Sequence, residues 1–182
     1  MKRVTIIGSP GSGKSTLARE LGGILDIPHF HMDHISSTPE GKPRPREEAA
    51  ALIADIVNAE RWIIEGHHYD DGDVRLEAAD TIVFLNFSRY LCLWRYLRRM
   101  IRYYGKASPG NYIVERIDRD LLRGFKFVFL FPRFTTPRIL KQLRHYEGSK
   151  TVYVLRNPSD VARFKLSMPN PVRPSGRFGT TG

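Results

Sequence analysis

The sequence has a single cysteine and no long apolar run, and both absences restrict what the protein can be. Cys92 is the only cysteine among the 182 residues, so no disulfide can form within the chain. Its apolar surroundings predict a buried thiol, and a chain without disulfides suits the reducing cytoplasm. No apolar run approaches the ~18 residues that a membrane-spanning helix needs, and the stretch Val4–Ile7 is too short for a signal-peptide core. We therefore expect a cytoplasmic protein with no membrane partner.

Acidic residues are few relative to basic ones. The chain has 29 Lys and Arg against 19 Asp and Glu, which gives a net charge of +10. Such an excess favours anionic partners, and polyphosphates, nucleic acid and membrane surfaces all carry the required charge. No helix-turn-helix, zinc-finger or RNP signature is present, so nucleic acid is the less favoured partner. The length suits one domain with its own core, and a monomer is the default expectation.

Short apolar segments alternate with helical patterns along most of the chain. We predict strands at residues 2–8, 28–32, 62–66, 81–85 and 151–155. Their apolar residues do not alternate with polar ones, as expected for parallel strands covered on both faces. Helical spacing of apolar residues predicts helices at 14–25, 47–58, 88–104, 112–130 and 136–146. The alternation implies βαβ units with right-handed crossovers, and therefore an α/β fold.

Composition leaves the structure of two segments less clear than the periodic pattern does elsewhere. Residues 125–131 are apolar enough for a buried strand, but they continue the pattern of Ile113, Ile117 and Leu121, which favours a helix. Residues 167–182 contain three prolines and three glycines and few apolar residues, so we expect a disordered tail after a single domain at 1–166.

The segment Gly8–Ser15 matches the pattern G-x-x-x-x-G-K-[ST] between a predicted strand and a predicted helix. Glycines let backbone N–H groups approach a phosphate, and the helix that follows points its positive end at the same anion. Lys14 would reach the β- and γ-phosphates of a nucleoside triphosphate, and the Ser15 hydroxyl would ligate Mg²⁺. We expect ATP with Mg²⁺ to be held by Gly8, Ser9, Pro10, Gly11, Ser12, Gly13, Lys14, Ser15 and Thr16.

The chain is too short for most motor or transporter ATPases, and it has no N-K-x-D stretch to read guanine. Residues 88–147 are rich in arginine, which suits phosphate geometry better than lysine does. Four of these arginines, spaced i, i+3, i+4 and i+7, would lie along one helix face: Arg95, Arg98, Arg99 and Arg102. We predict a helical lid whose Arg95 and Arg99 act on the transferred phosphate together with Lys14.

Beyond the phosphate loop, several blocks of the sequence resemble the DNA topology modulation protein group, which is similar to adenylate, shikimate and related small-molecule kinases. The resemblance covers about residues 1–166. It is carried by Ile6–Thr16, His31–His34, Trp62–Gly66, Ala79–Leu85, Leu93–Arg95 and Val154–Asn157. The phosphate loop is specific to the P-loop superfamily, and the order and spacing of the other blocks strengthen one another. The resemblance implies a five-stranded parallel sheet of order 2-3-1-4-5 flanked by helices.

The resemblance also implies roles for residues beyond the loop. Asp33 falls where such kinases place a carboxylate that orients the acceptor hydroxyl or holds Mg²⁺ through water. Glu65 and Gly66 end the third strand, where the acceptor would bind. Arg156 and Asn157 follow the fifth strand, where such kinases flank adenine. These positions should cluster, because open parallel sheets bind ligands beyond the carboxyl ends of their strands.

One residue departs from the pattern of that group. Asn86 ends the fourth strand where many relatives carry aspartate, and an amide supplies no negative charge to a metal shell. The leading interpretation remains an adenylate kinase-like phosphotransferase from ATP to a small acceptor. The alternatives are an ATP-binding, nucleic-acid-associated protein and a P-loop protein with weak ATPase activity alone. Nucleoside monophosphates, nucleosides, sugars and shikimate-like acids remain open as acceptors.

The histidine and tryptophan residues indicate function less clearly than the phosphate loop does. Histidines lie at two predicted strand ends: His29, His31 and His34 at the second, and His67 and His68 at the third. They could hold zinc, but no cysteine supports such a site, so we interpret them as residues of the acceptor pocket or of the sheet edge. Trp62 and Trp94 are predicted to anchor the core.

Overall fold

The computed structural model describes residues 1–67, 73–106 and 119–168. Several sequence predictions lie outside these ranges: His68, Arg116, the first part of the helix predicted at 112–130, and the expected tail from residue 169. In the described parts, none of the helices is both long enough and apolar enough to cross a membrane.

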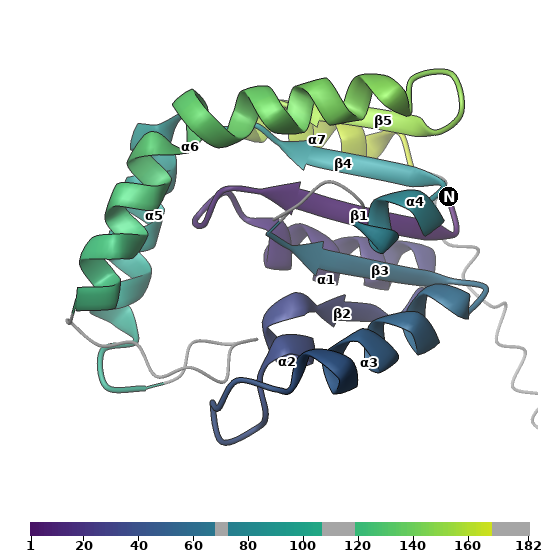
Figure 1. Ribbon diagram of the computed structural model, residues 1–182. Coiled ribbons are helices and arrows are strands. Elements are labelled where there is room, and N and C mark those ends of the chain that lie inside the picture. The colour runs from purple at the N-terminus through teal and green to yellow at the C-terminus, as the bar shows by residue number, and fades with distance from the viewer. Residues whose placement is uncertain (68–72, 107–118, 169–182) are drawn as a thin grey trace, which may run out of the picture.

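A five-stranded parallel sheet of order β2-β3-β1-β4-β5 forms the centre of the molecule (Figure 1). Its strands are β1 (Arg3–Gly8), β2 (His29–His31), β3 (Trp62–Gly66), β4 (Thr81–Leu85) and β5 (Thr151–Leu155). The central strand β1 places Val4 beside Ile63 of β3 and Thr81 of β4. All five predicted strands are confirmed, and so is the predicted order.

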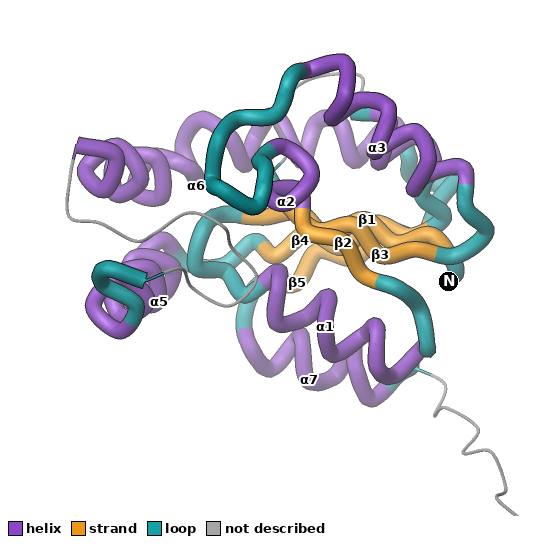
Figure 2. The backbone as a smooth tube through the Cα atoms, turned by 90° about the horizontal axis from the view of Figure 1, so that it is seen from below, coloured by secondary structure: helices purple, strands orange, loops and turns teal. Residues whose placement is uncertain are grey.

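Helices cover both faces of this sheet (Figure 2). Helices α1 (Lys14–Leu25) and α7 (Pro158–Leu166) pack on one face, against the side chains of Val4, Ile6, Ile63, Val83 and Leu85. Helices α3 (Arg46–Asn58), α4 (Val74–Ala78) and the later part of α6 (Arg119–His145) pack on the other, against Ile7, Trp62, Ile64, Ile82 and Phe84. Because successive side chains of a strand point to opposite faces, adjacent apolar residues supply two separate cores.

Helix α5 (Arg89–Arg102) leaves the sheet after β4, and the first half of α6 lies beside it (Figures 1 and 2). The Tyr96 and Phe125 rings meet edge to face with centroids 5.5 Å apart. Gly124 makes this packing possible, because a Cβ there would lie 2.2 Å from the Tyr96 hydroxyl oxygen. We call α5 together with residues 121–130 of α6 the arm.

Helix α6 corrects the prediction of two helices at 112–130 and 136–146. It is one helix of 27 residues that contains Pro132 and Pro137. Each proline inside a helix costs about 3 kcal/mol, so a break in this stretch would be locally favourable. Buried side chains of α6, however, continue past the prolines at helical spacing: Val128, Phe131, Ile139 and Leu143. Full burial of each contributes about 2 kcal/mol, which offsets the two prolines.

The two tryptophans have different environments. Trp62 is fully buried, as predicted, and its Nε1 donates to the Val57 carbonyl oxygen at 3.3 Å. The prediction for Trp94 is wrong, because 61% of this residue is exposed. It lies two positions after the buried Cys92 on α5, and two residues turn a helix by about 200°, so Trp94 faces away from the core. The buried thiol predicted at Cys92 is confirmed.

Three short helices were not predicted: α2 (Met32–Ser36), α4 and α7. The first two have five residues each, too few to show a helical repeat of apolar residues. Helix α7 did carry a local signal. Asn157 precedes Pro158, and its side chain accepts a hydrogen bond from the backbone N of Asp160 at 2.9 Å. Asn before Pro is a typical helix start.

We predict that Pro137→Ala raises the free energy of unfolding by about 1–2 kcal/mol, because alanine restores an N–H inside α6 at some cost in unfolded-chain entropy. Urea unfolding followed by circular dichroism measures it. Pro45→Ala is the control, since Pro45 precedes α3, where a missing N–H is harmless. A loss of stability in Pro137→Ala would contradict a continuous α6, because a proline that begins a separate helix is favourable.

Candidate functional site

The loop between β1 and α1 presents its backbone to the carboxyl edge of the sheet. Ser12 N donates to the Ser9 carbonyl oxygen at 3.1 Å, which closes the turn. Gly13 begins α1 with a left-handed backbone (φ 99°), and no side chain caps the helix. The first N–H groups of α1 therefore keep no side-chain acceptor, and together with the helix dipole they form an anion-binding cradle.

The same loop rests on the arm. Gly11 has φ 76°, and a Cβ there would lie 2.3 Å from the Cys92 carbonyl oxygen of α5. Glycine is therefore required both by the backbone conformation and by the close approach of the two backbones. Arg95 Nη1 donates to the Ser12 carbonyl oxygen at 3.3 Å. The arm and the loop are thus directly joined.

Lys14 lies beneath the loop with 8% of its surface exposed, and its Nζ donates to the Ser9 carbonyl oxygen at 3.1 Å. Burial lowers the pKa of Lys14 below its ordinary value, while the carboxylates of Glu65 and Asp33 oppose that shift. A buried ammonium needs such compensation, because desolvation penalises the charged form. Lys14 is therefore held close to the two carboxylates by the fold.

Glu65 is the most buried acidic side chain of the described residues, with 1% exposed. Burial acts to raise the pKa of Glu65, but His31, Lys14 and Ser15 outweigh it, and the pKa lies below its ordinary value. His31 Nε2 lies 2.9 Å from Glu65 Oε1. Oε1 is thus paired with His31, whereas Oε2 has no hydrogen-bond partner among the described residues. Glu65 is thus an ionised group with unused acceptor capacity beside the loop.

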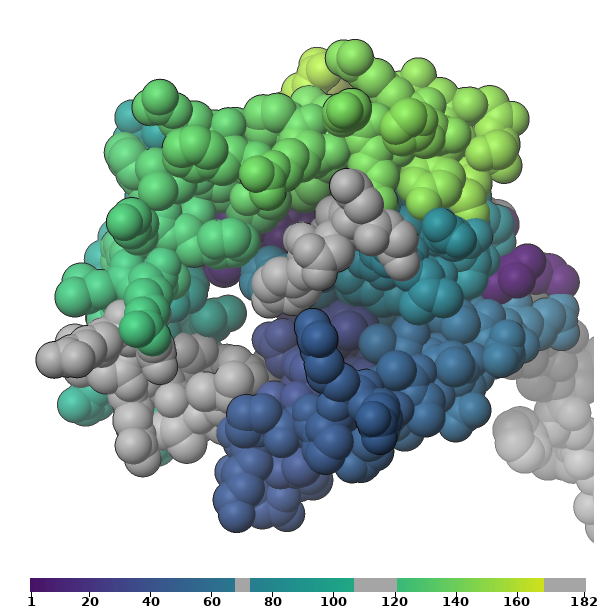
Figure 3. All heavy atoms as spheres, in the orientation of Figure 1, coloured from purple at the N-terminus to yellow at the C-terminus, as the bar shows by residue number. Residues whose placement is uncertain are grey.

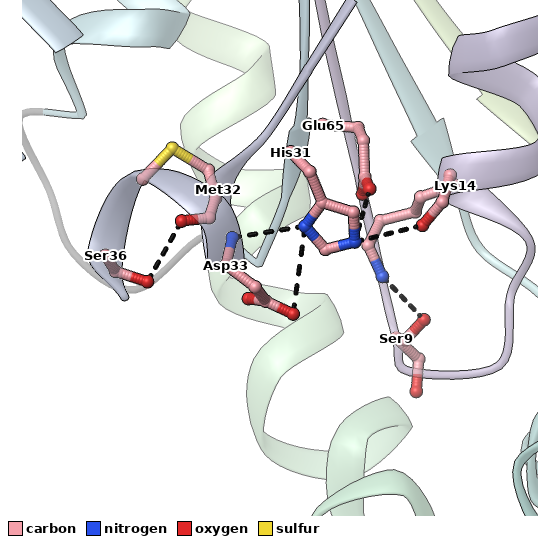
Figure 4. A network of polar contacts seen from close by, with 8 residues as sticks. Ser9, Lys14, His31, Met32, Asp33, Ser36 and Glu65 are labelled. Carbon is pink, nitrogen blue, oxygen red and sulfur yellow. Dashed lines mark hydrogen bonds and ion pairs between the residues drawn. The ribbon is translucent and has the colours of Figure 1, made fainter. Parts of the chain in front are cut away.

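His31 connects the elements around this carboxylate (Figure 4). Its Nδ1 accepts a hydrogen bond from the Asp33 backbone N at 3.1 Å, which caps α2. An accepting Nδ1 places the proton of a neutral imidazole on Nε2. That Nε2 lies 3.3 Å from the Ser15 hydroxyl oxygen as well as near Glu65. The backbone N–H of Asp33 therefore fixes the tautomer of His31. The His31 ring in turn links β2 to β3 and α1.

A cleft of about 1080 Å³ lies between these groups and the arm. In the space-filling view the surface is hollowed between α6 and the α2–α3 region (Figure 3). Residues 10–16 form one wall, and Asp33, Glu65 and Gly66 lie with them at the strand ends. The arm contributes Arg95, Arg99, Arg102 and Arg123. Cations and carboxylates thus meet in one concavity at the carboxyl edge of the sheet, where open parallel sheets bind ligands.

The cleft does not include every residue predicted for the site. Arg98 of the four-arginine face is exposed and does not line it. Arg156 and Asn157 are exposed at the β5–α7 turn, and Pro158, Val161 and Ala162 of α7 line the cleft instead. Asn86 is also not among the lining residues. Its two neighbours, Leu85 and Phe87, do line the cleft.

Several cleft residues had no defined role in the sequence prediction, and Arg123 and His67 are two of them. Arg123 was one of many arginines in residues 88–147, and only the packing of α6 beside α5 places it at the cleft. His67, the residue after β3, was grouped with the pocket or edge histidines without a defined role. Burial, assisted by the Lys14 ammonium, lowers the pKa of His67 from 6.5 to about 3, so its ring is neutral at physiological pH.

Solved structures with the same fold include two shikimate kinases and a sugar kinase. Shikimate kinase from Acinetobacter baumannii, solved in complex with shikimate, has a TM-score of 0.55 at 15% identity, covering 91% of this chain and 89% of that chain. Shikimate kinase from Bacteroides thetaiotaomicron has a TM-score of 0.53 at 15% identity, with 91% and 96% covered. A sugar kinase from Janibacter sp. HTCC2649 has 0.51 at 16% identity, with 91% and 92% covered.

No family model and no curated protein matches the chain. The structural likenesses identify the P-loop kinase fold, and identities this low do not extend to substrate. The finer resemblance to the DNA topology modulation group stays a prediction.

We predict that His67→Gln makes stability less dependent on pH between about pH 6 and 4. The unfolded chain binds a proton at His67 near its ordinary pKa of 6.5, and the folded chain does so only near 3. Protonation therefore favours the unfolded chain, and the wild type loses up to about 1.4 kcal/mol per pH unit from this residue across the window. Chemical denaturation at a series of pH values measures the slope. His145→Gln, at an exposed position, should keep the wild-type slope.

Proposed function

We propose that this protein is an ATP-dependent kinase that transfers the γ-phosphoryl group to a small acceptor, as nucleoside monophosphate kinases do. The observation that carries the proposal is the meeting, in one cleft, of the glycine-rich loop with Lys14, the buried carboxylate Glu65 and the arm arginines. Phosphoryl transfer depends on positioning and on compensation of negative charge, and these groups supply both. Residues 1–166 would act as one catalytic domain.

The loop is the proposed site of the triphosphate. Its backbone N–H groups and the start of α1 would bind the phosphate oxygens, and Lys14 would exchange its Ser9 contact for them. Arg95 and Arg99 approach from the arm and would neutralise the group in transfer. We place adenine against Pro158 and Val161 of α7, because these line the cleft and Arg156 does not. Asn157 supports this wall by capping α7.

The residues beside the loop fit Mg²⁺. Glu65 is an ionised carboxylate whose Oε1 pairs with His31 and whose Oε2 has no hydrogen-bond partner among the described residues, and the Ser15 hydroxyl lies next to the same His31 nitrogen. Oxygen donors of this kind are the ligands that Mg²⁺ prefers. We assign Ser15 to the metal and Glu65 to its surrounding waters, with Asp33 nearby. When bound, the ion would offset the charge of the phosphate oxygens.

The acceptor would lie between the ends of β2 and β3 and the arm. Asp33 has 39% of its side chain exposed, so its carboxylate can reach a ligand in the cleft, whereas Glu65 is enclosed. Asp33 is therefore the group that we assign to orienting the acceptor hydroxyl and taking its proton. Gly66 allows Met32 to pack against the end of β3, because a Cβ at Gly66 would lie 2.5 Å from Met32 Cβ. Arg102 and Arg123 face the acceptor region from the arm.

We predict that Lys14→Met abolishes stabilisation by MgATP, because the triphosphate loses the cation that reaches its terminal phosphates. The wild type should gain about 2.7 kcal/mol when a non-hydrolysable ATP analogue is present at 100 times its Kd. Thermal unfolding with and without the analogue measures this gain. Lys141→Met, at an exposed position on α6, should behave as the wild type. If the ATP analogue stabilised Lys14→Met as much as the wild type, the loop would not be the triphosphate site.

We predict that Arg99→Ala lowers phosphotransfer by about 100-fold or more, as expected when one stabilising donor is lost from the transition state. Arg98→Ala is the matched control: it is the adjacent residue of α5, but it faces solvent. ADP release is measured with nucleoside monophosphates, nucleosides, sugars and shikimate-like acids in turn. Equal rates for the two variants would contradict the proposed role of the arm. ADP release that no acceptor increases would indicate an ATPase instead of a kinase.

A further inference from the structure

The arm carries apolar side chains on the side that does not face the cleft. They include Tyr90, Trp94 and Ile101, which are 72%, 61% and 70% exposed. On α5 they follow one another at i, i+4 and i+11, so they lie on one face of the helix. We call the full set the outer apolar face: Tyr90, Trp94, Leu97, Ile101, Tyr104, Leu122 and Phe129.

The two helices contribute to one continuous surface. The Arg89 guanidinium carbon lies 6.0 Å from the centre of the Tyr90 ring on α5 and 5.0 Å from that of Phe129 on α6. Arg89 Nη1 also donates to the Phe129 carbonyl oxygen at 3.4 Å. Leu122 lies two turns before Phe129 on the same side of α6. Large exposed apolar patches on a folded protein mark interaction sites.

The described charged side chains of the arm are all cationic. Residues 87–106 and 121–146 contain no aspartate or glutamate. Several exposed cations that do not line the cleft belong to these segments: Arg98, Lys106, Lys126 and Arg133. A helix with aromatic and aliphatic residues on one face, bordered by arginine and lysine, has the composition of helices that lie in a membrane interface.

We propose that the outer apolar face docks on an anionic membrane surface, with α5 lying in the headgroup region. Charge complementarity selects this occupant, because anionic lipids attract juxtamembrane cations while the acyl boundary accepts the apolar side chains. A second copy of the chain would bring two cationic surfaces together. Nucleic acid would meet an aliphatic centre formed by Leu97, Ile101 and Leu122, which offers no hydrogen bonds to it.

The proposed surface is separate from the cleft. Arg95 and Arg99 face the cleft, and the buried Cys92 and Tyr96 lie between them and the outer apolar face around α5. Docking through Trp94 and Ile101 would therefore leave the cleft open to solvent and ligands. This inference does not depend on which reaction the cleft performs.

Intrinsic fluorescence tests the proposal, because Trp94 is 61% exposed while Trp62 is fully buried. We expect a blue shift of the emission, and cosedimentation, with vesicles of phosphatidylcholine that contain phosphatidylglycerol. Vesicles of phosphatidylcholine alone should give little of either, and added salt should weaken both. Ile101→Glu should lower partitioning at least about tenfold, because it places a charge among the buried apolar groups. Leu166→Glu, at a position on α7 that is 85% exposed, should bind as the wild type.

Other outcomes would overturn the proposal. One is the absence of a blue shift and of sedimentation at saturating anionic lipid. Another is equal binding to both kinds of vesicle, which would remove the role of charge. A dimer that Ile101→Glu dissociates in analytical ultracentrifugation, without binding to vesicles, would assign the face to a second copy. Salt-sensitive retention of duplex DNA that Ile101→Glu abolishes, without binding to vesicles, would assign it to nucleic acid. Circular dichroism and the stabilisation by an ATP analogue confirm that each variant is folded.

Discussion

The burial of the central strands on both faces is the constraint on which the rest of the structure depends. Every residue of β3 and β4 is buried, so neither face of these strands has room for a solvated site. Parallel strands end at the same edge, and the chemistry of this protein is confined to that edge. The loop after β1, the turn after β2 and the end of β3 meet there. The cleft follows from the topology before any single side chain is considered.

Charge balance then decides which groups can be buried at that edge. Lys14 and Glu65 would each be costly alone, because desolvation penalises both charged forms. Together, and with His31 fixed in one tautomer by the start of α2, the ammonium and the carboxylate each offset part of the other's desolvation cost in a largely enclosed position. The groups that we assign to phosphate and metal are therefore pre-arranged by their mutual attraction. Asp33, which is more exposed, is the carboxylate left for the acceptor.

Local patterns predicted the fold well, because each strand and the phosphate loop are encoded in a few adjacent residues. What they missed depends on contacts between distant segments. Tryptophan is usually buried, but Trp94 lies on the side of α5 that faces away from the core and is therefore exposed. The site role of Arg123 depends on packing between helices, and the enclosed position of Glu65 depends on β2 and α1. Asn86 does follow a strand at the ligand-binding edge, but which residues of that turn line the cleft depends on the packing of α5, which the local sequence does not encode.

The continuous helix α6 has a mechanical consequence. Its later half is fixed to the sheet through Ile139 and Leu143, and its first half forms a wall of the cleft. Pro132 and Pro137 lie between these halves, and each removes a backbone hydrogen bond from the helix. The part of α6 that bends most easily therefore lies between the half that is packed on the sheet and the half that lines the cleft. Bending there would move the four arginines that the arm contributes to the cleft, and the Gly11–Cys92 contact would transmit that movement to the phosphate loop.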